Sequence, residues 1–145
     1  MKMTKQEYMA YAGNKQPKSK HILNIVKAFI VGGAICCIGQ VLANMFYDLN
    51  LSIDDASAAT SVTLIGTAAL LTGLDWYGSI GKFSGAGALV PITGFANSIA
   101  SAALEFKSEG FILGMCAKMF QLAGPVLVVG FSLSIIYGLI LLFFI

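Results

Sequence analysis

The chain has 145 residues, of which 57% are hydrophobic and only 11% are charged. Soluble domains usually carry about 25% charged residues, so this chain cannot cover a water-exposed surface with charge and is predicted to be an all-α integral membrane protein. All nine of its positive residues are lysines, which excludes arginine-based voltage sensors and arginine phosphate clamps.

The N-terminal residues 1–21 form a basic tail in front of a single transmembrane domain, 22–145. Residues 1–27 contain six lysines and one acidic residue, Glu7. Because lysine-rich segments stay in the cytoplasm, this excess predicts a cytoplasmic N-terminus. A basic tail can also bind nucleic acid, but lysines beside a hydrophobic span are the usual topology signal, so no nucleic-acid partner is expected.

The first predicted span runs near 22–47. It carries no charge from 28 to 47, which covers about 30 Å at 1.5 Å per residue. Gln40 and Asn44 lie one turn apart on a stripe of small and polar residues that should face other helices. Two roles stay open for this pair: hydrogen bonding between helices, and lining of a water-filled path.

An acidic loop, 48–55, contains three aspartates and no lysine, which fits the outer side of the membrane. The second span follows near 56–74 and is predicted to end with Trp76 and Tyr77 in an interfacial belt. Threonine hydroxyls can bond to carbonyls of their own helix and then need no outside partner. Three threonines lie along one face of this span: Thr60, Thr63 and Thr67.

The third segment, near 83–106, is uncharged from 83 to 104 but has helix breakers in its first half: Gly85, Gly87, Pro91 and Gly94. Irregular backbone is not tolerated in contact with lipid, because unpaired peptide groups are costly there. The pattern therefore predicts a discontinuous or re-entrant segment shielded by protein, as in channels and transporters. The alternative is a close-packed helix whose glycines let neighbouring helices approach.

A helix that starts at Pro91 within the membrane directs unpaired N–H groups and a positive dipole end toward the break, where an anion can bind. The candidate pore and substrate-path residues are Gln40, Asn44, Pro91, Thr93, Asn97, Ser98 and Ser101. Glu105 and Glu109 lie one turn apart around Lys107. These three residues are candidates for contact with a partner or a cation such as calcium, or form a solvated loop face.

The stretch 110–123 reaches only about 21 Å as a helix, so it is predicted to be a short half-helix that does not cross. Pro125 suits the first position of a new helix, which places the last span at 125–145. The chain then has about four membrane segments. If the third crosses fully, both termini are cytoplasmic; if it re-enters, the C-terminus lies outside.

The residues give no basis for catalysis, so the chain is predicted not to be an enzyme. The only histidine, His21, lies in the polar tail, which excludes Ser–His–Asp and Cys–His sets. The cysteines lack the spacing of a metal site, and no nucleotide-binding motif occurs. Neither a bound metal nor a cofactor is expected.

Three blocks carry a family resemblance: VKAFIVGGAICCIGQ at 26–40, LLTGLDWYGSIGKFSGAGALVPITGFANSIASAALEFKSEG at 70–110 and KMFQLAGPVLVVG at 118–130. With them the chain resembles the stage V sporulation protein AC family of spore-forming Firmicutes over about residues 10–140. The resemblance implies a subunit of the SpoVA complex in the spore inner membrane. That complex moves calcium-chelated dipicolinic acid into the forespore and releases it during germination.

The resemblance also implies a channel-forming, mechanosensitive subunit. Its implied partners are an AE(b)-type membrane subunit and a soluble AD-type subunit, and calcium enters only as part of the transported chelate. From the residues alone, two functions stay open. One is a small pore or transport subunit that needs further copies or a partner to enclose a path. The other is a non-conducting scaffold that assembles a membrane complex through glycine-rich helix faces.

Overall fold

The computed structural model describes residues 4–15 and 20–144, and these ranges are helical with no β-strand. Three helical stretches are long and apolar enough to cross a membrane: His21–Asp48, Ile53–Gly73 and Phe111–Phe144. Helices suit this environment because all their backbone hydrogen bonds are made within the segment. The all-helical membrane class expected from composition therefore agrees with the structure.

The N-terminal helix α1, Lys5–Lys15, lies in the basic tail and begins with a capping box. The Thr4 N–H donates to Glu7 Oε2 at 2.8 Å, and the Glu7 N–H donates to Thr4 Oγ1 at 3.4 Å. Hydrogen bonding of the Glu7 carboxylate, first by the Thr4 backbone N–H and then by the Thr4 side chain, holds the pKa of this carboxyl below its usual value. Part of the tail expected at 1–21, including Lys2 and Lys18, lies outside the described residues.

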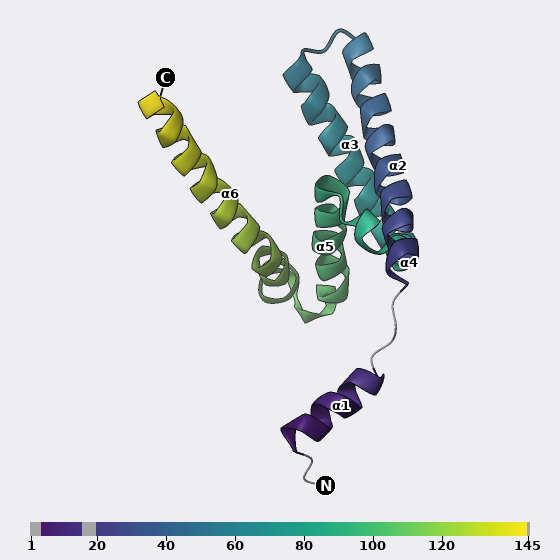
Figure 1. Cartoon of the computed structure of the whole chain (residues 1–145). Coiled ribbons are helices and arrows are strands. Elements are labelled where there is room, and N and C mark those ends of the chain that lie inside the picture. The colour runs from purple at the N-terminus through teal and green to yellow at the C-terminus, as the bar shows by residue number, and fades with distance from the viewer. Residues whose placement is uncertain (1–3, 16–19, 145) are drawn as a thin grey trace.

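Helices α2, His21–Asp48, and α3, Ile53–Gly73, form a hairpin (Figure 1). Ser52 caps α3, because its side chain accepts the N–H of Asp55 at 3.1 Å. The threonines along α3 bond to their own helix as expected. Thr60, Thr63 and Thr67 each donate to the carbonyl four residues earlier at 2.8 Å.

The chain leaves regular α-helix where the glycines and Pro91 predict a break. Helix α4, Trp76–Ser84, is followed by the 3-10 turn η1, Gly85–Ala88, and then by helix α5, Pro91–Glu105. Pro91 occupies the first turn of α5, where its missing N–H costs no hydrogen bond. The alternative of one unbroken close-packed helix over 83–106 is therefore wrong.

Tyr77 holds this break in place and does not belong to an interfacial belt, which corrects the sequence prediction. Its side chain is only 5% exposed, and its hydroxyl donates to the Ala88 carbonyl at 2.9 Å. The bond satisfies a carbonyl that the irregular backbone would otherwise leave unpaired away from water. Tyr77 also packs with Ala68, Ala88 and Ala96 in the small core where α3, α4 and α5 meet.

The C-terminal third corrects the prediction of a separate half-helix at 110–123 and a new helix at Pro125. After the 3-10 turn η2, Lys107–Glu109, a π-helix, Phe111–Cys116, leads directly into α6, Ala117–Phe144. Pro125 lies inside α6. Gly124 before it has no Cβ to clash with the proline ring, and helices in membranes tolerate proline where the freed carbonyl finds another partner.

Figure 1 shows how these elements are arranged. Helices α2 and α3 lie side by side, and α5 begins beside the middle of α3 and packs along its lower half. Helix α6 starts near the lower end of α5 and diverges from the other helices. Its side chains from 125 to 144 are exposed, so α6 adds little to the core of this chain.

Candidate functional site

A groove of about 460 Å³ lies between α2 and α3 and reaches the start of α5. We call it the polar groove. Its α2 side carries Gln40, Asn44 and Tyr47, and its α3 side carries Ser57, Thr60 and Ser61. Val90 and Ile92, on either side of Pro91, also line it, so the groove meets the N-terminal end of the short helix.

Gln40 and Asn44 act as a pair in this groove. The Gln40 side-chain N–H donates to Asn44 Oδ1 at 2.9 Å, one helical turn away. The bond leaves the Gln40 carbonyl oxygen and the Asn44 amino group able to bind water, a solute or another helix. Two roles were open for this pair, hydrogen bonding between helices and lining of a water-filled path. Both residues line the polar groove.

The N-terminal end of α5 has no side-chain cap, because its N-cap residue is Val90. The Gly94 N–H bonds back to the Val90 carbonyl at 2.8 Å, while the N–H groups of Ile92 and Thr93 lie at the open end of the helix. A helix end of this kind carries partial positive charge and favours carboxylates and other anions. The structure therefore contains the uncapped helix N-terminus that the predicted anion site requires.

Thr93 adds a second unusual feature to the first turn of α5. Its side chain is 7% exposed, and Thr93 Oγ1 is the only buried side-chain oxygen or nitrogen in the described ranges that has no hydrogen-bond partner. Leaving such a hydroxyl unpaired costs about 1–3 kcal/mol. Buried polar groups are nearly always paired, so this one requires an explanation.

The other candidate residues of α5 are bonded within the protein. Asn97 Oδ1 lies 2.9 Å from Thr72 Oγ1, which joins α5 to α3. Ser98 donates to the Phe95 carbonyl and Ser101 donates to the Asn97 carbonyl. Asn97 and Ser101 therefore have structural bonds, and neither lines the polar groove.

Pro91 and Ser98 face a second, wider space of about 1020 Å³ between α3, α5 and α6. We call it the apolar groove, since Ile65, Phe95 and Val126 are typical of its lining. The candidate residues are therefore spread over several places: Gln40 and Asn44 line the polar groove, Pro91 and Ser98 line the apolar groove, Asn97 joins two helices, and Thr93 and Ser101 line neither groove. The three charged candidates, Glu105, Lys107 and Glu109, are exposed. Among the described residues, no further acidic, His or Cys side chain joins Glu105 and Glu109 to form the calcium site that was considered for them.

Sequence reasoning missed the α3 side of the polar groove and the two residues that fix the break, Thr72 and Tyr77. A signal for the first existed, because Ser57, Thr60, Ser61 and Leu64 have the spacing of one helical face. No local signal pointed to Tyr77, because its partner Ala88 lies 11 residues away across the break. In the part of the chain that the structure describes, no cluster of three or more His, Cys, Asp or Glu could hold a metal.

Comparison with known proteins gives two matches of the same kind. The family model of SpoVAC/SpoVAEB sporulation membrane proteins matches residues 24–140. The chain is also 51% identical over 139 residues to the stage V sporulation protein AC of Bacillus subtilis strain 168, covering 94% of this chain and 91% of that protein. No solved structure matches the chain. The matched range includes the whole polar groove and the break.

Proposed function

Because the chain belongs to the SpoVAC/SpoVAEB family of sporulation membrane proteins, we propose that it is a channel or transport subunit of the SpoVA complex. Its substrate is dipicolinic acid, carried as the calcium chelate, which enters the forespore and leaves during germination. The observation that supports this function is the polar groove, which carries Gln40 and Asn44 and reaches Val90 and Ile92 at the uncapped N-terminus of α5.

The chemistry of dipicolinate suits this groove. In the calcium chelate the two charges of dipicolinate balance those of Ca²⁺, and each carboxylate keeps an outer oxygen that can accept hydrogen bonds. The positive end of α5 favours such an oxygen without placing a full charge in the membrane. The amides of Gln40 and Asn44 can donate further hydrogen bonds along the path. A site of neutral groups binds a passing solute weakly enough to release it, as conduction requires.

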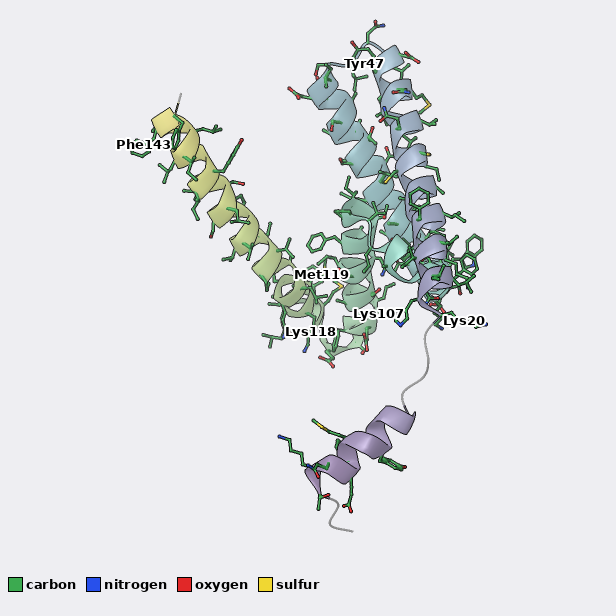
Figure 2. All side chains as sticks on the ribbon, viewed as in Figure 1. Lys20, Tyr47, Lys107, Lys118, Met119 and Phe143 are labelled. Carbon is green, nitrogen blue, oxygen red and sulfur yellow. The ribbon has the colours of Figure 1, made fainter. Side chains whose placement is uncertain are left out.

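In this proposal, α2, α3 and α6 cross the spore inner membrane, and residues 76–105 enter and leave it from the cytoplasmic side. The charges support the orientation. Lys20, Lys107 and Lys118 lie at the lower end of the molecule, and Tyr47 lies at the opposite end, next to the acidic loop 48–55 (Figure 2). The positive-inside rule then puts the lower end in the cytoplasm and the end of α6 outside.

The path needs more than one chain. The polar groove is open on one side, and α6 stands apart from α2 and α3 (Figure 1). A second copy or the AE(b)-type membrane subunit would complete the wall, and the AD-type soluble subunit would bind at the membrane surface. These partners are the ones that the resemblance implies, and the open groove is the feature that they would close.

A scaffold that does not conduct is the competing function. It is supported by the exposed face of α6 with Gly130, Ser134 and Gly138 at four-residue spacing, which suits close helix association. Reconstitution of the purified protein in liposomes separates the two functions. Tension-activated current or dipicolinate efflux supports the channel, whereas intact binding to the AE(b)-type subunit without any flux from the joint complex supports the scaffold.

The sharpest variant for the channel is Thr93→Val, which removes the hydroxyl and keeps the shape of the side chain. Since the hydroxyl has no protein partner, the free energy of unfolding should stay the same or rise. Thr93 does not line the polar groove and its hydroxyl is shielded from solvent, so the variant tests whether the first turn of α5 opens during transport. If the hydroxyl pairs with the solute in that open state, release of dipicolinate from germinating spores should slow by roughly tenfold. Gln40→Ala should slow release as well, because it removes one amide of the groove.

Thr63→Val is the matched control, because the Thr63 hydroxyl already bonds to the Ala59 carbonyl and Thr63 does not line the polar groove. It should leave the release rate unchanged. Normal release in Gln40→Ala spores, with the variant present at normal level, would remove the polar groove from the path, and normal release in Thr93→Val spores would remove the first turn of α5 from it.

A further inference from the structure

A third pocket lies at the lower end of the molecule and takes no part in the proposed path. It has a volume of about 380 Å³ and lies between the first turns of α2 and the α4–η1 turn. We call it the basic pocket. Its ionisable lining residues are His21, Lys27 and Lys82, and Asn24 adds an uncharged amide. No carboxylate lines it.

Lys27 is the residue that makes this pocket unusual. It is the only charged residue between His21 and Asp48 in an otherwise apolar helix. It lies about 9 Å along α2 from His21, which places it just inside the apolar part of the helix. To keep its charge at such a position, a lysine needs contact with water, an extended side chain that brings the ammonium to the membrane interface, or a nearby negative charge.

The structure fixes where the Lys27 ammonium lies. Lys27 Nζ is 4.6 Å from the centre of the Phe83 ring on the neighbouring helix α4. Phe83 directly follows Lys82 and precedes the break. Its contact with Lys27 therefore holds Lys27 and Lys82 at the same pocket. The cation–π contact orients Lys27 but leaves its three N–H donors able to bind an anion.

Two side chains of the lining are large, apolar and exposed. Ile25 and Phe83 line the pocket and are largely exposed, so a membrane surrounds its rim. A soluble anion requires an aqueous entrance, whereas a phospholipid brings its phosphate to this depth and its glycerol and upper acyl carbons to the apolar rim. Basic pockets between membrane helices on the cytoplasmic side bind anionic lipid headgroups in this way.

We propose that the basic pocket binds the phosphate of an anionic phospholipid, with Lys27 and Lys82 as its two cationic contacts. The bound lipid supplies the counter-charge of Lys27 and joins the start of α2 to the α4–η1 turn that forms the break. The site depends on neither the transport of dipicolinate nor the polar groove, so its test stands apart from that of the proposed function.

The test titrates the full-length protein in neutral detergent with dioctanoyl phosphatidylglycerol and counts bound lipid by native mass spectrometry. The zwitterionic dioctanoyl phosphatidylcholine and inorganic phosphate are titrated in parallel. We expect tighter binding of the anionic lipid, and roughly 30-fold weaker binding in the double variant Lys27→Gln, Lys82→Gln, since each lysine near a surface adds to the attraction.

The matched control is Lys107→Gln with Lys118→Gln. It removes the same charge at the same end of the molecule, and Lys118 also makes a cation–π contact, at 4.8 Å from the Phe106 ring. This control should bind the anionic lipid within about threefold of the unaltered protein, because general surface attraction is only a part of the effect. Equal weakening in the two double variants would overturn the proposal.

Two further outcomes show whether the bound phosphate belongs to a lipid or is free in solution, and whether the glutamine variants act through charge or through misfolding. Displacement of the lipid by inorganic phosphate at equal concentration would assign the pocket to a soluble anion and overturn a lipid site. Lys27→Arg with Lys82→Arg keeps both charges and should restore lipid binding if Lys27→Gln, Lys82→Gln acts through charge. Failure of the arginine variant to bind lipid while it stays folded by circular dichroism would count against phosphate recognition.

Discussion

Gly87 is the residue on which the position of the break depends. A Cβ at this position would lie 2.5 Å from the Ala28 carbonyl oxygen and 2.8 Å from the Ala28 Cα, both backbone atoms of α2. Gly32, one turn further along α2, lies against the Gly87 carbonyl. Glycine is therefore needed at 87 for the close approach of two backbones, and its φ plays no part in the requirement.

Gly87→Ala should destabilise the protein, because the added methyl group has to push η1 away from α2. We expect a loss of about 1–3 kcal/mol in the free energy of unfolding, as for overpacking elsewhere. The control is Gly81→Ala, where no atom lies within 4 Å of the new Cβ and helix propensity improves. Equal unfolding curves for the two variants in detergent would show that the close contact carries no stability.

At the scale of elements, α5 packs extensively against α3, and a polar link joins the two helices. The Thr72 hydroxyl lies 2.7 Å from the Ala68 carbonyl and 2.9 Å from Asn97 Oδ1. A hydroxyl has only one proton, so the hydroxyl donates to Ala68 and the Asn97 amide bonds to Thr72 best with its amino group turned toward the hydroxyl oxygen. Asn97 therefore acts as a link between helices.

A double-mutant cycle of Thr72→Val and Asn97→Ala measures this link. Helix contacts of this kind in membranes average about 0.6 kcal/mol and reach about 1.7 kcal/mol, so we expect a coupling energy in that range. If Asn97 acts only through the link, Thr72→Val should slow dipicolinate release as much as Asn97→Ala does. Slower release in Asn97→Ala spores alone would instead place Asn97 on the path.

At the scale of the whole molecule, the ends of the bundle differ in charge and in packing. The lower end contains the core formed by α3, α4 and α5 and carries Lys20, Lys107 and Lys118, whereas the upper end carries the acidic loop 48–55 (Figure 2). The proposed topology, in which residues 76–105 re-enter from the cytoplasm, rests on this charge difference and on α5, which starts beside the middle of α3 and runs back to the lower end (Figure 1).

Cysteine labelling of whole cells tests that topology in a background with Cys36, Cys37 and Cys116 replaced by serine. The probes are Leu49→Cys, Ser108→Cys and Phe143→Cys, all at exposed positions. Re-entry with a cytoplasmic N-terminus predicts that a membrane-impermeant reagent labels 49 and 143 but not 108. A fully crossing third segment gives 49 and 108 labelled and 143 protected, and an inverted orientation gives 108 alone.

The sequence by itself determined the class of the protein and most of its helices. The low charge predicted a membrane protein, and the apolar lengths predicted α2 and α3 to within a few residues. The breakers between Gly85 and Pro91 predicted where the helix stops, because proline and glycine act on their own backbone. The three sequence blocks predicted the family, which the comparisons confirm.

Only the tertiary structure decided how these parts meet. Local sequence patterns could not predict three features: the continuation of α6 through Pro125, the burial of Tyr77, and the hydrogen bond between Asn97 and Thr72. The positions of Tyr77 and Asn97 depend on partners that are distant in sequence. The continuation of α6 depends on the surrounding helix, which tolerates the proline. Likewise, the sequence shows that Gln40 and Asn44 are polar, but their place in a groove that also reaches the start of α5 follows from the way α2 and α3 pack together. Local rules act over a few residues, whereas a site is made where separate helices converge.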